Sequence, residues 1–314
     1  MEISRIKRVD SNVQSSREIG RVSNGDARDQ GWQLSSLPAS CKYLGVSDKS
    51  EVTLEGGSRT TVSRKGDVIF RSAKPQSRTV ISLLQHLRSV GFGAAPRPMG
   101  SGFAPDGREQ FEYIDGESPQ PLAWSDAAVS EIGRLLRQFH DAGRSFSPPA
   151  NATWSEWFAR SLPGSSPVFG HGDLGPWNIL AKDGMPVAFI DWDNAGPVDA
   201  VWELAHVAWQ NAQLHDDDVA QLNDLSDAAH RAHQVRLIVD GYGLRAVDRS
   251  DFVDKMIELA IRGAREEAIE YSVGPDSDSA FSDGYPVMWA ITWRARGAAW
   301  MIDHRTMLNA ALTT

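Results

Sequence analysis

Two polar runs, HGDLGPWNIL at residues 171–180 and VAFIDWD at residues 187–193, constrain this chain more than any other feature. Asp173 and Asn178 lie five residues apart with Gly-Pro between them, a spacing that requires a tight loop. Asp191 directly follows an apolar run, so we expect it at the end of a buried strand. The sequence therefore predicts polar loops at the ends of short strands.

The polar side chains of these runs suit a metal ion and a general base. Asp173, Asn178, Asp191 and Asp193 offer oxygen ligands, with no cysteine and few histidines nearby. Such a set favours Mg²⁺, which binds carboxylates together with the phosphate oxygens of a substrate. A further carboxylate within reach could accept a proton from a hydroxyl nucleophile.

The two runs resemble the catalytic core of the aminoglycoside phosphotransferase family, the small-molecule branch of the protein-kinase-like fold. The signature of that family is His-Gly-Asp, a four-residue gap, Asn, and a later Asp-x-Asp or Asp-x-Glu. The resemblance implies that Asp173 is the catalytic base, that Asn178 and Asp191 bind the metal ion, and that His171 braces the loop. It also implies ATP or GTP and Mg²⁺ as cofactors, with Asp193 as a supporting residue.

The rest of the chain predicts an α+β fold of two lobes. Residues 1–45 are rich in Ser, Arg, Asp, Asn and Gly and predict a flexible arm. Residues 46–116 predict a small antiparallel β lobe with one helix, and residues 117–314 a larger, mostly helical lobe with the catalytic and metal-binding loops. Two lobes that are joined once favour a cleft between them.

Apolar spacing and turn residues place the elements within these lobes. Strands are expected near 52–54, 61–62, 68–70, 97–101, 109–114, 168–169, 179–180 and 187–190. Helices are expected from Ser77 to Gly91, from a cap at Ser125 or Asp126, and over 199–213, 217–240, 250–272 and 284–311.

The resemblance extends to the nucleotide side of the chain. The run at 54–77 is similar to the hairpin that covers the nucleotide, which implies that Gly56, Gly57 and Ser58 approach the phosphates. Arg71 stands where the family carries its phosphate-binding lysine; a plain surface charge is the alternative.

Two further features of the nucleotide side are the ion-pair partner of Arg71 and the connector between the lobes. The helix after Arg71 offers no glutamate as an ion-pair partner, and Gln85 and His86 are its nearest polar candidates. The run at 111–117 is similar to the connector between the lobes, which implies that backbone groups of Glu112, Tyr113 and Ile114 hydrogen-bond the purine.

Acidic residues further along the chain carry two more expectations. The run WELAHVAW at 202–209 resembles the helix after the metal-binding aspartate, and implies that Glu203 anchors the catalytic loop from below. An ordinary helix position is the alternative. In this family the substrate lies against the C-terminal helices, so Glu266, Glu267 and Glu270 are candidates to face a cationic acceptor; an exposed helix face is the alternative.

Composition limits the functional classes. The net charge is −9, with 16 Lys and Arg against 9 Asp and Glu in residues 1–100, and 16 against 32 in residues 101–314. This balance argues against a general nucleic-acid binder. No apolar run approaches the ~20 residues of a membrane span. The single Cys41 excludes an internal disulfide and predicts a reducing, cytoplasmic compartment.

The functional prediction is an ATP-dependent kinase that phosphorylates a hydroxyl of a small molecule, for which the acidic surplus suggests a positive charge. The alternative is a non-catalytic immunity or ligand-binding protein that keeps the fold, because the phosphate-binding lysine and its glutamate are missing. Within the family the chain is most similar to a bacterial subgroup that includes the trifolitoxin-immunity-like proteins. The shared features include the runs at 91–97 and 241–244.

Overall fold

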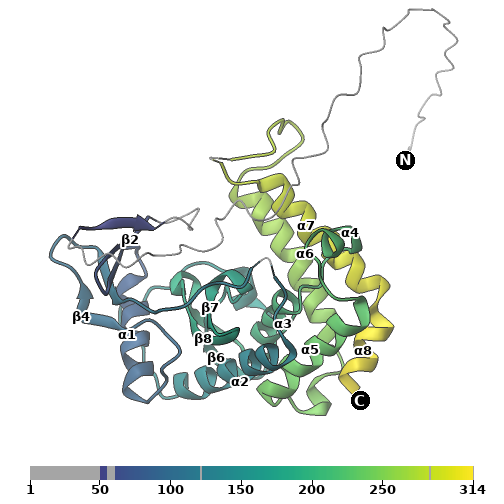
Figure 1. Cartoon of the computed structure of the whole chain (residues 1–314), viewed down its shortest axis with the longest axis horizontal. Coiled ribbons are helices and arrows are strands. Elements are labelled where there is room, and N and C mark those ends of the chain that lie inside the picture. Colours follow the sequence, from purple (N-terminus) through teal and green to yellow (C-terminus); the bar gives the residue numbers. More distant parts are fainter. Residues whose placement is uncertain (1–49, 55–60, 121, 283, 314) are drawn as a thin grey trace, which may run out of the picture. The chain divides into compact units, whose positions relative to one another are not determined.

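The computed structural model describes residues 50–54, 61–120, 122–282 and 284–313 (Figure 1). The arm expected over residues 1–45 lies outside the described residues, as do Gly56, Gly57 and Ser58. The described part is α+β and two-lobed, which confirms the fold class: an antiparallel sheet with one helix is followed by a mostly helical lobe. The boundaries of the lobes remain predictions.

The first lobe is built on a five-stranded antiparallel sheet with the strand order β1-β2-β3-β5-β4. The central pair, β3 and β5, sets Arg71 directly opposite Glu109 and Val68 opposite Glu112. Arg71 therefore leaves the sheet beside a carboxylate of the neighbouring strand. The strands are β1 (Val52–Leu54), β2 (Val62–Lys65), β3 (Val68–Arg71), β4 (Pro98–Phe103) and β5 (Glu109–Glu112).

Helix α1 (Ser77–Ser89) packs its apolar face into the core, with Leu83, Leu84 and Leu87 almost fully buried. The chain leaves this helix through Gly91, whose φ of 90° lies in the left-handed region that glycine adopts without strain. The predicted limits of this helix are confirmed.

The second lobe combines two small antiparallel sheets with seven helices in its described part. Strand β6 pairs with β9, and β7 with β8. Ser125 caps α2 by accepting from the Ala128 N–H, as predicted. The strands are β6 (Pro167–Gly170), β7 (Ile179–Lys182), β8 (Met185–Phe189) and β9 (Gly196–Asp199). The helices are α2 (Asp126–Gly143), α3 (Ala200–Asn211), α4 (Asp217–Leu222), α5 (Ala228–Tyr242), α6 (Phe252–Glu270), α7 (Val287–Asp303) and α8 (Arg305–Thr313).

Two predicted helices are wrong in their length. The helix expected over 217–240 is divided into α4 and α5, because Asp224 takes a positive φ of 51° and the Asp227 side chain caps a new helix at the His230 N–H. The helix expected over 284–311 ends at Asp303, and α8 starts after His304. Strand β9 was not predicted, since its Gly-Pro sequence disfavours strands.

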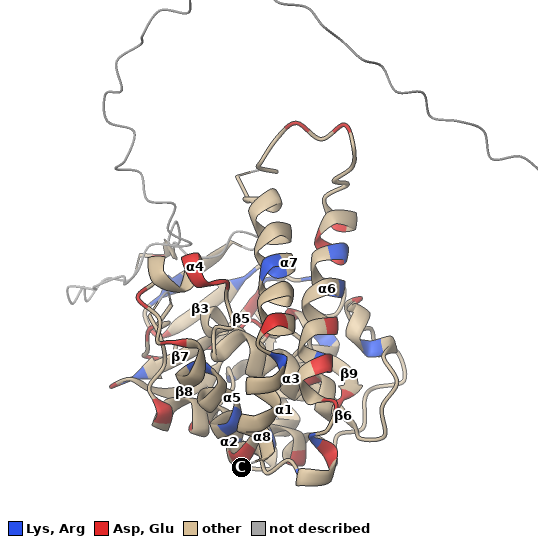
Figure 2. Cartoon of the chain, turned by 90° about the vertical axis from the view of Figure 1, so that its right-hand side faces the viewer, with Lys and Arg blue, Asp and Glu red and all other residues tan. Residues whose placement is uncertain are grey.

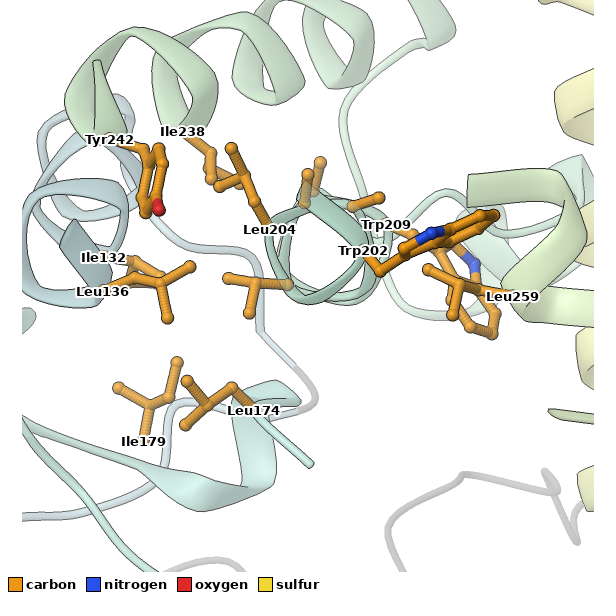
Figure 3. Packing of buried hydrophobic residues seen from close by; sticks show 14 of the residues in the cluster. Ile132, Leu136, Leu174, Ile179, Trp202, Leu204, Trp209, Ile238, Tyr242 and Leu259 are labelled. Atoms are coloured by element: carbon orange, nitrogen blue, oxygen red, sulfur yellow. The ribbon is translucent and has the colours of Figure 1, made fainter. Parts of the chain in front are cut away.

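Helix α3 runs through the core of the second lobe, and almost all of its residues are buried. Figure 3 shows Leu204 of this helix pointing toward Ile238 of α5, with Leu174 and Ile179, which flank the loop between β6 and β7, in the same cluster. This loop therefore rests on a helix that is buried along almost its whole length. Within the described residues, no helix combines the length and the apolar sequence that crossing a membrane requires.

Candidate active site

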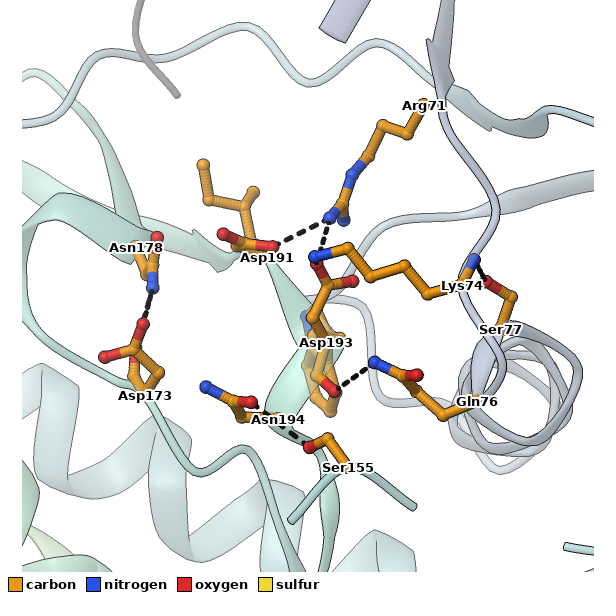
Figure 4. Close-up of polar contacts among 12 residues, drawn as sticks. Arg71, Lys74, Gln76, Ser77, Ser155, Asp173, Asn178, Asp191, Asp193 and Asn194 are labelled. Carbon is orange, nitrogen blue, oxygen red and sulfur yellow. Dashed lines mark hydrogen bonds and ion pairs between the residues drawn. The ribbon is translucent and has the colours of Figure 1, made fainter. Parts of the chain in front are cut away.

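Asp173 and Asn178 face each other across the loop between β6 and β7 (Figure 4). The Asn178 side-chain amide donates to the Asp173 backbone carbonyl at 2.8 Å and to the Asp173 carboxylate Oδ2 at 3.0 Å. A short 3-10 helix, Pro176–Asn178, closes the loop between them, in agreement with the tight loop expected from the sequence. Because the amide nitrogen is turned to Asp173, the amide oxygen of Asn178 is its remaining acceptor.

His171 joins this loop to the end of β8. Its ring is fully buried and packs against Trp192 at 4.8 Å between ring centroids. Nε2 lies 2.9 Å from the Ile190 carbonyl, and Nδ1 accepts from the Asp173 N–H at 3.3 Å. Burial lowers the pKa of His171 to about 4, so the ring is neutral at physiological pH, with the hydrogen on Nε2. The histidine thus positions the backbone of Asp173.

Glu203 lies beneath the same loop and is 1% exposed. Its Oε1 accepts from the backbone N–H groups of His171 and Gly172, and its Oε2 lies 2.7 Å from His140 Nε2. His140 Nδ1 in turn lies 2.8 Å from the Tyr242 hydroxyl. Burial opposes ionisation of Glu203, but these hydrogen bonds, the one from His140 first, outweigh it and hold the pKa of Glu203 below its usual range. The carboxylate is therefore a charged acceptor for the loop.

Two glycines make room for this arrangement. A Cβ at Gly170 would lie 2.3 Å from Glu203 Oε2 and 2.4 Å from a Val198 methyl group. Gly172 has a φ of 83°, and a Cβ there would lie 2.4 Å from the Asn194 carbonyl. Gly170 therefore allows the close approach of α3, and Gly172 allows the close approach of the segment at Asn194.

Asp191 follows β8 and takes a left-handed backbone conformation, with φ 62° and ψ 63°. This conformation is unfavourable for a residue with a Cβ, by about 1–2 kcal/mol, and such strain is concentrated at functional sites. It turns the Asp191 carboxylate toward the first lobe, where Arg71 Nη2 donates to its Oδ1 at 2.8 Å (Figure 4). The backbone N–H of the preceding Ile190 donates to the Asn178 carbonyl at 2.9 Å, which keeps Asp191 next to the Asp173–Asn178 pair.

Asp193 is the meeting point of three side chains from the first lobe. Arg71 Nη2 and Lys74 Nζ donate to its Oδ2 at 2.7 and 2.6 Å, and the Gln76 side-chain amide donates to its backbone carbonyl at 3.1 Å. Arg71 is thus a bridge between the lobes and not a surface charge. Sequence analysis placed Asp193 as a supporting residue, but the Gln76 contact carried no signal in the sequence.

Burial and charge act differently on the acids of this cluster. The pKa of Asp191 is raised by partial loss of solvation, although its side chain is 47% exposed, and Arg71 offsets only part of this effect. Burial also opposes ionisation of Asp193, but Arg71 and Lys74 outweigh it and hold the pKa of Asp193 below its usual range. A third acid, Glu109, carried no signal in the sequence; burial raises its pKa, and the Ser77 hydroxyl and the positive charge of Arg71 offset part of this effect.

The donor set fits a hard divalent cation in part. Asn178 Oδ1 and Asp191 Oδ2 are oxygen donors that the contacts described above leave available, and Mg²⁺ commonly takes one or two protein ligands with phosphates and water completing its shell. Among the described residues, no cluster of three or more His, Cys, Asp or Glu side chains could hold a metal ion alone. The site therefore suits a metal that arrives with a phosphate ligand.

The connector offers fewer backbone donors than the sequence suggested. The Glu112 N–H donates to the Arg97 carbonyl at 2.9 Å, and the Tyr113 N–H donates to the Asp67 carbonyl at 2.8 Å. Both N–H groups are therefore committed to the protein. Of the three connector residues, Ile114 alone keeps an N–H without a hydrogen bond to another described residue.

The expected acceptor residues Glu266, Glu267 and Glu270 do not form one acidic face. Glu267 is 6% exposed and is paired with Arg294 of α7 at 3.2 Å, and Glu266 lies 3.2 Å from Arg265. Figure 2 shows acidic and basic positions mixed along α6. The structure thus gives no support to an uncompensated acidic surface on this helix.

Helix α3 carries further polar side chains next to the loop that holds Asp173, and no pattern in the sequence singled them out. Asn211 donates to the Leu174 carbonyl at 2.8 Å, so Glu203 and Asn211 hold the loop at two points along α3. Between them lie His206 and Gln210, whose Nδ1 and Oε1 atoms are buried without a hydrogen-bond partner among the described residues. Two such atoms beside a catalytic loop are candidates to contact a ligand.

Comparison with known proteins agrees with this geometry. Residues 149–238, which include both polar runs, match the family described as "Phosphotransferase enzyme family". The trifolitoxin immunity protein of Rhizobium leguminosarum bv. trifolii is 50% identical over 262 residues, covering 83% of this chain and 98% of that protein.

Solved structures share the fold at low identity. A choline/ethanolamine kinase family protein from Mesorhizobium loti has a TM-score of 0.54 at 16% identity, over 87% of this chain and 94% of that one. Amicoumacin kinase, solved in complex with AMP-PNP, Ca²⁺ and Ami, has a TM-score of 0.55 at 12% identity, over 83% of this chain and 88% of that one. Spectinomycin phosphotransferase, solved with ADP and spectinomycin, has a TM-score of 0.50 at 10% identity, over 81% of this chain and 93% of that one.

Proposed function

The chain belongs to the phosphotransferase enzyme family, and from this premise we propose that it transfers the γ-phosphate of ATP or GTP to a hydroxyl group of a small molecule. One observation carries the proposal: Asn178 orients the Asp173 carboxylate, and Asp191 projects from the next strand end beside them. The single Cys41 supports a reducing compartment, the cytoplasm, as the place of this activity.

In the proposed reaction Asp173 orients the acceptor hydroxyl and takes its proton. The acceptor oxygen forms a bond to the γ-phosphorus while the bond from that phosphorus to the β–γ bridging oxygen breaks, and the nucleoside diphosphate leaves. His171 accepts from the Asp173 N–H, and Glu203 accepts from the N–H groups of His171 and Gly172, so their part is to hold Asp173 in place.

Asn178 and Asp191 would hold the metal ion, which neutralises charge on the phosphates when bound. Arg71 and Lys74 are the cations of the first lobe that reach this region, and both would contact phosphate oxygens. The relatives solved with ADP or with AMP-PNP and Ca²⁺ support a nucleotide and a divalent metal ion. Ile114 is the connector N–H that we assign to the purine.

The acceptor side is best assigned to α3. His206 and Gln210 lie on the helix beneath the Asp173 loop, and His206 Nδ1 and Gln210 Oε1 are buried without a hydrogen-bond partner in the described part of the chain. Glu267 is already neutralised by Arg294, so it is a weaker candidate for binding a cation.

A second candidate is a non-catalytic immunity protein with a kinase-like fold. The 50% identical relative is named an immunity protein, and Arg71 pairs with Asp191 itself. Binding of Mg²⁺–ATP with slow background hydrolysis favours the enzyme, whereas no detectable nucleotide binding favours the immunity protein.

The direct test is a phosphate-release screen with a library of hydroxylated metabolites and antibiotics, run on the wild type and on Asp173→Asn. A positioned general base contributes about 10²–10⁴-fold, so the variant should lose that much turnover and remain folded. Asp183→Asn, an exposed carboxylate in the β7–β8 turn, is the matched control and should keep full activity. An Asp173→Asn variant that turns over a verified acceptor at the wild-type rate refutes the assignment.

A further inference from the structure

Arg71 lacks the partner that its position in the sheet calls for. In protein kinases the cation of the third strand is held by a glutamate from the helix that follows. Here α1 contains no Asp or Glu in any of its 13 residues, and the nearest acids, Asp191 and Asp193, belong to the other lobe. If Asp191 takes up a metal ion, Arg71 loses one of these two partners.

Glu109 stands where it can replace that partner. It lies directly opposite Arg71 in the β3–β5 register and is 4% exposed. The Ser77 hydroxyl, which accepts from the Lys74 N–H at 2.7 Å, interacts with this carboxylate. Arg71 and Lys74 are the positive charges that act on it. A buried carboxylate is retained where such partners compensate it.

The carboxylates of this cluster outnumber its cations. Two cations, Arg71 and Lys74, serve three carboxylates, and Lys74 remains with Asp193 at 2.6 Å. When a metal–nucleotide complex occupies Asp191, the carboxylate that stays beside Arg71 within the same sheet is Glu109. The planar guanidinium has five donors, so it can contact this carboxylate and a phosphate at once.

On this basis, and resting on the proposed kinase function, we propose that Glu109 is a positioning residue that holds the Arg71 guanidinium against the nucleotide phosphates. Glu109, on strand β5, then has the role that a glutamate of the following helix has in protein kinases, which explains how α1 can lack an acidic residue. Glu109 acts through Arg71 and touches no substrate itself.

The test measures binding of Mg²⁺–ADP and of adenosine by calorimetry to the full chain. Glu109→Gln keeps the size and the acceptor for Ser77 but removes the charge; we expect Mg²⁺–ADP to bind about 10-fold more weakly and adenosine to bind as before. Asp106→Asn is the matched control, because it removes an exposed carboxylate paired with Arg108 in the same lobe. It should change neither affinity.

A double-mutant cycle separates the positioning role from a structural one. In an Arg71→Ala background, Glu109→Gln should cause no further loss of Mg²⁺–ADP affinity, because the group it positions is gone. Additive losses, or an equal loss for adenosine, overturn the proposal. If Glu109→Gln does not fold, Glu109→Asp carries the test, with an expected weakening of about 3-fold for Mg²⁺–ADP alone. Absence of Mg²⁺–ADP binding in the wild type instead refutes the kinase function.

Discussion

Replacing Glu203 with alanine should detach the loop that carries Asp173. The two carboxylate oxygens accept from the N–H groups of His171 and Gly172 and from His140 Nε2, all within the buried core. The alanine variant leaves three donors without an acceptor. Each unsatisfied buried group costs about 1–3 kcal/mol, and a water molecule can fill part of the space. We therefore expect the free energy of unfolding to fall by about 3–5 kcal/mol.

Glu203→Gln separates hydrogen bonding from charge. The amide oxygen can accept from both loop N–H groups, and the amide nitrogen then faces His140 Nε2. His140 can become the acceptor there and donate from Nδ1 to the Tyr242 hydroxyl, because either ring nitrogen can carry the hydrogen. The hydrogen bonds to the charged Glu203 carboxylate become weaker bonds to a neutral amide, but the variant no longer has to bury a negative charge. We expect a loss of about 1–2 kcal/mol for this variant.

Urea unfolding followed by tryptophan fluorescence reports this loss, since Trp192 packs directly against His171. Glu258→Ala on α6 is the control: its carboxylate is half exposed and pairs with Arg262, so the change should stay within about 0.5 kcal/mol. If Glu203→Ala costs less than about 1 kcal/mol, or equals Glu203→Gln, the carboxylate does not hold the loop and the reasoning fails.

Two further predictions concern the same region. Gly170→Ala should displace Glu203 from His140, because the new Cβ would lie 2.3 Å from Glu203 Oε2. We expect the free energy of unfolding, measured in urea, to fall by about 2–3 kcal/mol. Gly93→Ala is the control and should change it little, because nothing lies within 4 Å of a Cβ there. A Gly170→Ala variant as stable as the wild type contradicts the clash. Stability should also decline as the pH falls from 7 to 5, through three buried histidines.

The sequence predicted the contact between Asp173 and Asn178 because the two residues are close together in the chain. Asp173 and Asn178 are five residues apart, and a Gly-Pro turn with apolar flanks allows them few arrangements. Glu203 was also recognised, since it follows the metal loop at the spacing of the family. The contact with His140, 63 residues away, could not be read from the chain, because a buried histidine on an amphipathic helix looks like any other core position.

The contacts of the first lobe could not be predicted from the sequence, because they join residues that are distant in the chain. Arg71 bonds to acids about 120 residues away, and Glu109 meets Arg71 only because β5 and not β4 lies next to β3. Strand order depends on the packing of the whole lobe, whereas alternation of apolar residues identifies a strand and says nothing about its neighbour. The sequence shows that α1 contains no acidic residue. Only the pairing of β3 with β5 identifies Glu109 as the residue that we propose in its place.

The pH prediction rests on the sign of three shifts. Burial lowers the pKa of His171 and His206 to about 4 and that of His215 to about 3, all below the ordinary value of 6.5. These rings stay neutral in the folded protein while the unfolded chain binds protons, so the stability they contribute is complete above pH 6.5 and is lost as the pH falls. Each should cost about 2 kcal/mol between pH 7 and 5. Asp191 and Glu109, with raised pKa values, act in the opposite direction.

His215→Asn keeps an acceptor for Trp293 Nε1 and removes the titrating group, so the loss of stability between pH 7 and 5 should shrink by about 2 kcal/mol. An unchanged loss would show that folding does not lower the pKa of His215.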